Sequence, residues 1–249
     1  MARADRQQSL KNKNRPRPAR REHLEVSSYR FYMMKIKHNL KAIVLHSGGL
    51  DSTVCLLLAL EKHFDVLSLG VDYGQQSRAE LQYATNLCSR FEVNRKVINI
   101  EWDKPKRHIP MDRTLEEIHK GISSAFLPGR NAVFLALACA EATGFGASEI
   151  WFGANWIDYS GYPDCRPEFV KTFQMMIDVA IPEGINIVAP LMSMTKQEIA
   201  QEAYRLGLRP GDTWSCYRPK ETPNGPKECG RCDACILHKH AWENALHNI

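Results

Sequence analysis

The residues best suited to chemistry follow a short apolar run, 41–45, and read His46-Ser-Gly-Gly-Leu-Asp-Ser-Thr53. Gly48 and Gly49 allow a tight turn that brings backbone N–H groups close to a ligand. A helix starting after this turn directs the positive end of its dipole at the same point. Asp51 adds a carboxylate able to hold Mg²⁺ against phosphates. The segment predicts a pyrophosphate site, although a glycine turn with a purely structural role has the same pattern.

This segment lacks the Gly-x-x-x-x-Gly-Lys-Ser/Thr pattern of the Walker loop. It resembles the Ser-Gly-Gly-x-Asp-Ser loop of the PP-loop ATP pyrophosphatases, enzymes that split ATP between the α and β phosphates. The resemblance implies that ATP contacts this loop and two later segments. The implied ATP-binding residues are His46, Ser47, Gly48, Gly49, Leu50, Asp51, Ser52, Thr53, Asp72, Tyr73, Gln75, Gly129 and Arg130.

Four of the eight cysteines cluster late in the sequence, with the spacing C-x12-C-x2-C-x2-C. Two thiolates separated by two residues can bind one ion, and a thiolate from a preceding loop completes a tetrahedron. The intervening segment 218–228 has three prolines and no hydrophobic face, so we expect its order to depend on a metal. The predicted ligands of one Zn²⁺ per chain are Cys216, Cys229, Cys232 and Cys235.

Spacing alone leaves an iron–sulfur cluster open as an alternative to zinc. Four thiolates close the coordination sphere, whereas a catalytic zinc keeps a position for water, so we expect a structural metal. Cys55, Cys88 and Cys139 have apolar neighbours in predicted helices and are expected in the core. Cys165 lies in a polar loop, where it either faces a ligand or only packs.

Charge is unevenly distributed along the 249 residues, which carry a net charge of +5. Residues 1–40 contain 11 Lys and Arg against 3 Asp and Glu, while the remainder contains 22 against 25. We expect a basic, disordered extension over 1–38, which either contacts RNA or has no role. A nucleotide-binding domain over 39–212 and a zinc-binding segment over 213–249, ending in a helix, should follow. With eight cysteines and no export signal or membrane-length apolar run, we expect the reducing cytoplasm.

Strands and helices alternate along the body of the chain. Apolar runs predict strands over 41–46, 66–71, 96–100, 149–153 and 185–188, and helical patterns cover 53–64, 79–91, 131–143, 167–180 and 195–206. Residues 101–130 are expected to be irregular, and 155–165 to form a polar and aromatic loop. This alternation predicts an α/β fold with an open, mostly parallel, doubly wound sheet, in which ligands bind beyond the carboxyl ends of the strands. The glycine loop, 72–75 and 155–165 should converge there.

Three further stretches make the resemblance specific. They are Phe-Leu-Pro-Gly-Arg-Asn at 126–131, Asp-Tyr-Ser-Gly-Tyr-Pro-Asp-Cys-Arg at 158–166, and the cysteine cluster. Together with 47–52 and 72–75, in this order, they resemble the 7-cyano-7-deazaguanine synthase family of queuosine biosynthesis over about residues 40–240. The resemblance implies the PP-loop, adenine nucleotide alpha-hydrolase-like fold. The long loop between Cys216 and Cys229 and the basic extension depart from the family pattern, and neither touches the predicted chemistry.

The resemblance implies that 7-carboxy-7-deazaguanine and ammonia become the nitrile, with Mg-ATP as the dehydrating agent. Adenylation makes a carboxylate electrophilic, ammonia displaces AMP, and a second adenylation removes water from the amide. Such chemistry rests on positioning and charge stabilisation. The implied catalytic residues are Asp51, Lys196 and Arg130. Lys196 resembles the phosphate-contacting lysine of PP-loop enzymes, or else is a solvated helix residue. Arg130 offers a planar fork for a phosphate or the substrate carboxylate.

Recognition of the base follows from its chemistry. The pairing edge of guanine presents adjacent donors that suit a bidentate carboxylate, so Asp158 and Asp164 are candidates. Tyr159 and Tyr162 are candidates for stacking on the ring, and Arg166 for pairing with the 7-carboxylate. The alternative is that this loop only shapes turns.

Three other functions share parts of this pattern. A tRNA sulfurtransferase would need cysteines that the metal already occupies, and an RNA-binding module without catalysis would not need the intact glycine loop. A relative that adenylates another carboxylate is disfavoured by the 158–166 loop. The expected partners are therefore ATP, the carboxylated deazaguanine and ammonia, in a homodimer without stable nucleic acid or membrane contacts.

Overall fold

The computed structural model describes residues 40–62, 65–102, 108–155 and 162–247. Residues 39–249 cluster as one compact unit, and the basic extension over 1–38 lies outside the described residues. The candidates Asp158 and Tyr159 also lie outside them.

Five parallel strands form the central sheet in the order β3-β2-β1-β4-β5. The strands are β1 (Lys41–Leu45), β2 (Asp65–Asp72), β3 (Asn94–Asn99), β4 (Glu149–Trp151) and β5 (Asn186–Val188). The chain first builds outward from β1 to β3, and then continues on the other side of β1 with β4 and β5. The predicted open, parallel sheet is therefore confirmed. This order places the topological switch point between β1 and β4, where such sheets bind their ligands.

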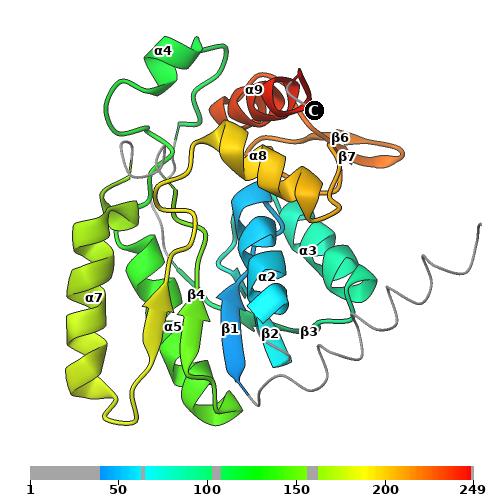
Figure 1. Cartoon of the computed structure of the whole chain (residues 1–249). Coiled ribbons are helices and arrows are strands. Elements are labelled where there is room, and N and C mark those ends of the chain that lie inside the picture. Colours follow the sequence, from blue (N-terminus) through cyan, green and yellow to red (C-terminus); the bar gives the residue numbers. More distant parts are fainter. Residues whose placement is uncertain (1–39, 63–64, 103–107, 156–161, 248–249) are drawn as a thin grey trace, which may run out of the picture. The chain divides into compact units, whose positions relative to one another are not determined.

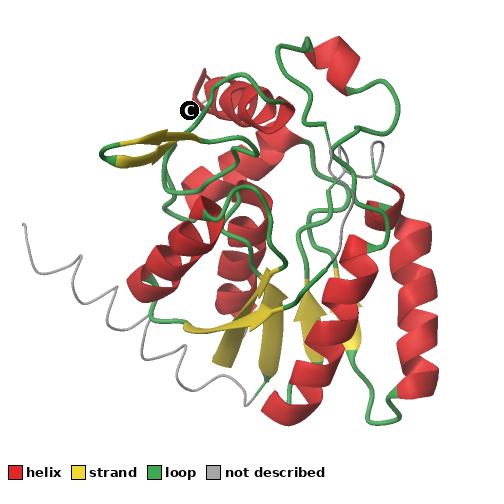
Figure 2. Cartoon of the chain, turned by 180° about the vertical axis from the view of Figure 1, so that it is seen from behind, coloured by secondary structure: helices red, strands yellow, loops and turns green. Residues whose placement is uncertain are grey.

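Helices cover both faces of the sheet (Figure 1). One face packs against α2 (Leu50–Lys62) and α3 (Ala79–Arg90), and the other against α5 (Arg130–Phe145) and α7 (Pro167–Ala180). Figure 2, the view from behind, shows the face that α5 and α7 cover. The pleat of β1 explains both layers, because Ala42 and Val44 contact the first pair of helices and Ile43 contacts the second. All three are fully buried, which fits a strand covered on both sides.

Two helix boundaries differ from the sequence prediction in ways that matter for the site. Helix α2 begins at Leu50 and not at residue 53, because the hydroxyls of Ser52 and Thr53 bond to the Gly49 carbonyl at 3.1 Å and 2.8 Å and hold the first turn. Helix α5 begins at Arg130, directly after a left-handed Gly129 with φ 77°. Asp51 and Arg130 therefore both lie in the first turn of a helix.

The region above the carboxyl ends of the strands contains α8 (Lys196–Arg205), α9 (Asp233–His247) and the hairpin β6 (Lys220–Thr222) and β7 (Gly225–Lys227) (Figure 1). The expectation of an irregular 101–130 is corrected in one place. A short helix, α4 (Leu115–Ile118), starts at a capping box in which Thr114 and Glu117 bond reciprocally. Among the described helices, none has the length and apolar character needed to cross a bilayer.

Candidate active site

A cavity of about 600 Å³ lies beyond the carboxyl ends of β1, β2 and β4, at the switch point of the sheet. Its walls come from the glycine loop, from 73–81, from the starts of α5 and α8, and from the C-terminal segment. Segments distant in sequence therefore meet where the topology places a ligand site.

The glycine loop is held in shape by its own side chains and by a close neighbour. Ser47 and Ser52 bring their hydroxyl oxygens to 3.1 Å, and the Ser47 hydroxyl accepts from the Gly49 N–H at 3.3 Å. Gly48 has φ 99°, and a Cβ there would lie 2.2 Å from the backbone oxygen of Glu80. The loop thus needs glycine for its conformation and for its contact with α3. The first N–H groups of α2 follow directly, without intrahelical partners, as an anion site requires.

Asp51 lies at the centre of the polar contacts in this cavity. Its Oδ2 accepts a hydrogen bond from the Asn155 amide at 2.6 Å and forms an ion pair with Lys196. Its Oδ1 is buried and has no hydrogen-bond partner among the described residues. A buried carboxylate oxygen without a partner is costly, and it suits a cation such as Mg²⁺.

Lys196 is placed by a helix cap. Thr195 accepts from the Glu198 N–H at 3.2 Å, and Glu198 accepts from the Thr195 N–H at 2.7 Å. This is the capping box that the sequence predicts, and it makes Lys196 the first residue of α8. The ammonium group is therefore brought to Asp51 by the start of a well-capped helix.

Arg130 reaches the cavity among aromatic hydroxyls. Its guanidinium hydrogen-bonds the hydroxyl of Tyr73, and Tyr162 and Tyr217 also face it. Burial raises the pKa of Tyr73, so its hydroxyl stays neutral. A planar cation beside this neutral phenol keeps its full charge available to an anionic ligand.

His46 follows β1, where it is 1% exposed. Its Nδ1 lies 3.0 Å from the Ser68 hydroxyl and its Nε2 3.1 Å from that of Thr53. Burial, with help from the Arg95 charge, lowers the pKa of His46 to about 3. The imidazole is therefore a neutral bridge between β1, β2 and α2 that supports the loop from below.

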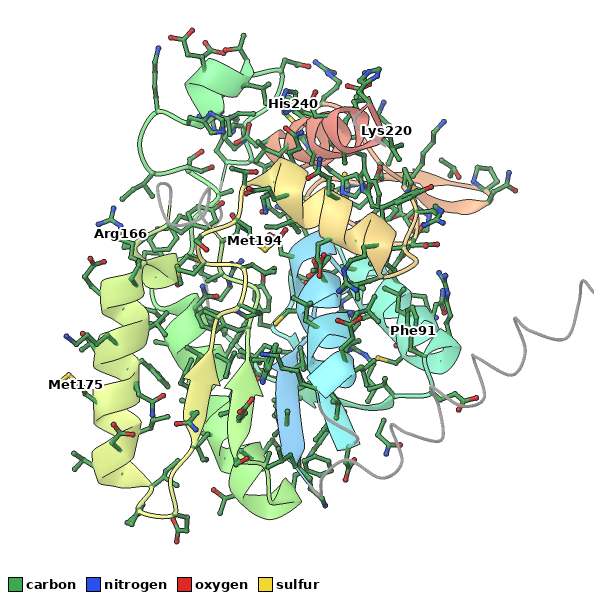
Figure 3. All side chains as sticks on the ribbon, in the orientation of Figure 1. Phe91, Arg166, Met175, Met194, Lys220 and His240 are labelled. Atoms are coloured by element: carbon green, nitrogen blue, oxygen red, sulfur yellow. The ribbon has the colours of Figure 1, made fainter. Side chains whose placement is uncertain are left out.

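Of the candidates in 158–166 that the structure describes, only Tyr162 is directed into the cavity. Tyr162 lines it and stacks on Phe126 with ring centroids 5.3 Å apart. Asp164 is buried outside the lining, where its Oδ2 accepts from the Asn131 N–H at 3.2 Å, and burial raises its pKa. Arg166 is exposed at the start of α7, away from the cavity (Figure 3). In this structure Asp164 anchors the start of α5, and Arg166 faces solvent.

The four predicted metal ligands lie together. The Sγ atoms of Cys216, Cys229, Cys232 and Cys235 all lie within 4.8 Å of one another, and all four residues are buried. The backbone N–H of Cys232 donates to the Cys229 sulfur at 3.3 Å, and that of Cys229 to the Cys216 sulfur at 3.3 Å. Buried sulfurs at this spacing that accept N–H donors fit a metal ion such as zinc.

The structure brings most of the predicted ATP and catalytic residues to one cavity. The residues that line it are His46, Ser47, Gly49, Leu50, Asp51, Ser52, Tyr73, Gln75, Arg130 and Lys196. Four others lie outside the lining: Gly48 and Gly129 in turns, Thr53 in the first turns of α2, and Asp72 at the end of β2.

Sequence reasoning missed several polar residues of the site, and three of them bear on its chemistry. Asn155 bonds to Asp51, Glu80 lines the cavity beside Gln75, and His238 lines it from α9. Asn155 follows β4, so its position after a strand was the available signal. Glu80 and His238 lie within helices, where a polar residue carries no mark that separates it from a solvated face.

The family model described as "Queuosine biosynthesis protein QueC" matches residues 41–246 of the chain. The "7-cyano-7-deazaguanine synthase 2" of Rhodopseudomonas palustris (strain HaA2) is 49% identical over 203 residues, which cover 82% of this chain and 97% of that protein. The 7-cyano-7-deazaguanine synthase of Myxococcus xanthus (strain DK1622) is 39% identical over 218 residues, with coverage of 82% and 94%. Among solved structures, the NMN synthetase of Francisella tularensis is 13% identical, with a TM-score of 0.47 and coverage of 90% and 92%.

Proposed function

Since the chain belongs to the QueC family of queuosine biosynthesis proteins, we propose that it converts 7-carboxy-7-deazaguanine and ammonia to 7-cyano-7-deazaguanine with ATP. The observation that carries the proposal is the position of Asp51. It joins Lys196 to the glycine loop, in a cavity that also holds Arg130. A backbone cradle, a lysine and an arginine in one cavity suit the transfer of an adenylyl group to an acid.

In the first step the loop amides and the start of α2 bind the β and γ phosphates. Lys196 offsets the charge that grows on the departing pyrophosphate, and Asp51 holds the lysine in place. Mg²⁺ bound with ATP would neutralise further phosphate charge, and the partnerless Oδ1 of Asp51 is the oxygen available to it. The acid then attacks the α phosphorus, and Arg130 is positioned to orient a carboxylate or a phosphate.

Ammonia then displaces AMP to give the amide, and a second ATP activates the amide oxygen, so that loss of AMP yields the nitrile. The reaction therefore consumes two ATP per product and releases AMP and pyrophosphate. Both adenylations use the same cradle, because the acid and amide oxygens occupy the same place relative to the base.

Recognition of the base is proposed for the aromatic side of the cavity. Tyr162, already stacked on Phe126, is the candidate that lines it. The anchoring bond from Asp164 to α5 favours a supporting role for that residue over direct contact with the base. Asp158 and Tyr159 remain sequence-based candidates for the same task.

Zinc is the metal that we propose for the cysteine cluster, in a structural role, because four thiolates leave no open position. None of the eight cysteines, all of which lie in the described residues, forms a disulfide, which is consistent with the proposed reducing cytoplasm. The homodimer expected from the sequence stays a prediction.

The proposal is tested with the purified full chain, the carboxylated deazaguanine, ammonium and Mg-ATP. Mass spectrometry should detect the nitrile, while nucleotide analysis shows two AMP per nitrile and no accumulation of ADP. An assay without ammonium should release pyrophosphate without forming nitrile. If ADP is formed, or if another carboxylate in place of the deazaguanine supports equal AMP formation, the proposal is wrong.

A further inference from the structure

Glu80 is a cavity carboxylate that the scheme above does not use. Three carboxylates line the described part of the cavity, and two of them are paired: Asp51 with Lys196, and Asp233 with Arg113. Glu80 receives a 3.4 Å hydrogen bond from the Gln75 amide and forms no ion pair with a described residue. Its carboxylate is therefore available to a ligand.

The packing of α3 keeps Glu80 close to the phosphate cradle. The backbone oxygen of Glu80 lies where a Cβ on Gly48 would come within 2.2 Å of it, and the backbone nitrogen of Ala84 would be 2.8 Å from the same atom. The first two turns of α3 thus rest directly on the glycine loop. This contact fixes the root of the Glu80 side chain beside the site of adenylyl transfer.

The surroundings of Glu80 let it hold or release a proton at neutral pH. Burial raises its pKa to about 7, although Arg130 on α5, the Gln75 amide and Arg95 on β3 each act to lower it. Tyr73, the nearby phenol, stays neutral because burial raises its pKa as well. A general base works best when its pKa lies near the working pH.

We propose that Glu80 is the general base for the nitrogen nucleophile, accepting the protons that nitrogen must lose on the way from ammonium to nitrile. The inference rests on the proposed function and adds a catalytic residue to it. A carboxylate without an ion-pair partner in the described residues also attracts ammonium, which Arg130 and Lys196 would repel.

The proton balance requires an acceptor at each step in which nitrogen loses a proton. Ammonium first gives one proton to Glu80, and the freed lone pair forms the C–N bond while the C–O bond to AMP breaks, its electron pair leaving on AMP. The nitrogen then loses a second proton to water, which completes the amide. Glu80 passes its own proton to water before the next step.

After the second adenylation has released pyrophosphate and a proton, the adenylated amide carries one N–H. Glu80 takes that proton, the N–H electron pair becomes the third C–N bond, and the C–O bond to AMP breaks. One carboxylate thereby serves both AMP-releasing steps.

Glu80→Gln separates this role from ATP binding, because it preserves the size of the side chain and removes its charge. Pyrophosphate release from acid and ATP without ammonium should match that of the unaltered protein. Nitrile formation should fall by about 100-fold or more, and the acidic limb of its pH–rate profile near neutral pH should disappear. Hydroxylamine is uncharged at neutral pH, so it should capture the adenylated acid as hydroxamate equally well in both proteins.

Glu80→Asp keeps a carboxylate and should recover part of the nitrile rate with a shifted pH profile. Glu183→Gln, in the exposed turn after α7, is the control and should change none of these readouts. In the contrary case, Glu80→Gln would lower pyrophosphate release as much as nitrile formation and would raise the KM for ATP. Glu80 would then bind the ribose of ATP, and the proposal would be wrong. An unchanged pH–rate profile would overturn it too. If the unaltered protein makes no nitrile, the proposed function fails first.

Discussion

At the scale of single residues, Asp51 is where the contacts of the cavity converge. One of its oxygens is shared by Lys196 and Asn155, and the other is buried without a partner among the described residues. Removing Lys196 would leave an inward-facing carboxylate uncompensated, which costs more than the pair contributes. The pair is therefore better explained by the phosphate chemistry beside it than by stability.

Lys196→Gln should lower pyrophosphate release by about 100-fold or more, because it removes a fixed positive charge from the transition state. A continuous pyrophosphate assay at saturating ATP measures this directly. Lys171→Gln, on the exposed surface of α7, is the matched control and should leave the rate unchanged. A loss limited to the KM for ATP would mean that Lys196 binds the ground state only.

His46 predicts a pH dependence of stability. Its pKa is lowered from 6.5 to about 3 in the folded chain, so the unfolded chain binds a proton that the folded chain does not. The contribution of neutral His46 is complete above pH 6.5 and declines as the pH falls towards 3, by about 1.4 kcal/mol per pH unit. His46→Gln should remove this dependence. Urea unfolding of both proteins between pH 7 and pH 4.5 should give converging free energies, and parallel curves would contradict the assignment.

At the scale of elements, the glycine loop and α3 form one unit, because Gly48 leaves no room for a side chain between them. Gly48→Ala combines a left-handed backbone with a 2.2 Å approach to backbone that cannot move aside cheaply. The variant should lose about 1–3 kcal/mol of unfolding free energy, and ATP binding should weaken with it. Chemical denaturation and calorimetric titration with ATP measure the two effects.

Gly184→Ala is the control for that variant. Gly184 has φ 79°, and a Cβ there would meet nothing within 4 Å. Gly184→Ala therefore carries the backbone strain without the collision, and it should cost about 1 kcal/mol while leaving ATP affinity unchanged. Equal losses in the two variants would mean that strain, and not the contact with α3, explains the glycine.

Local signals account for the parts of the fold that the sequence predicted well. The apolar run of β1, the glycine pair and the capping box at Thr195 each specify structure within a few residues, and all three are confirmed. The hairpin β6–β7 and helix α4 were not predicted. The hairpin pairs three-residue strands that lack an apolar face, and α4 is a single turn without a buried residue.

The residues of the site also fall into those that a local pattern predicts and those that depend on tertiary packing. Residues that follow strands could be predicted, because parallel strands end at a common edge. Asn155, Glu80 and the anchoring role of Asp164 depend on how α3, α5 and β4 pack, which no local pattern specifies. Such contacts arise from pairings between residues far apart in the sequence, so they become visible only in the fold.

At the scale of the whole folded unit, the cysteine segment and one wall of the cavity are joined. Met111 pairs with Cys232 in an antiparallel bridge, and the Asp112 N–H donates to the Arg231 carbonyl at 2.8 Å. Arg113 forms an ion pair with Asp233 at the start of α9. The segment 109–127, which contains this attachment, supplies a wall of the cavity. A structural metal here would therefore also support the shape of the active site.

Cys232→Ser tests the metal. It should remove bound zinc, because three thiolates bind it far more weakly than four, and it should lower the melting temperature. Elemental analysis of the purified chain gives the metal content, with one zinc expected before the substitution and much less than one after it. Cys139→Ser, buried in α5 and remote from the cluster, controls for the loss of a core thiol. An iron signal in place of zinc would correct the metal.

Arg113→Ala tests whether the ion pair with Asp233 positions the cavity wall, independently of the metal. It should raise the KM for the carboxylated deazaguanine by about tenfold, equivalent to 1.4 kcal/mol, because the cavity wall loses its anchor on α9. Zinc content and the KM for ATP should stay unchanged, since neither the cysteines nor the glycine loop contacts Arg113. Lys120→Ala removes the exposed pair with Glu116 on the same segment and should do nothing. If Arg113→Ala released zinc as fully as Cys232→Ser does, the ion pair would stabilise the metal-binding segment itself. The prediction that it positions the cavity wall would then be wrong.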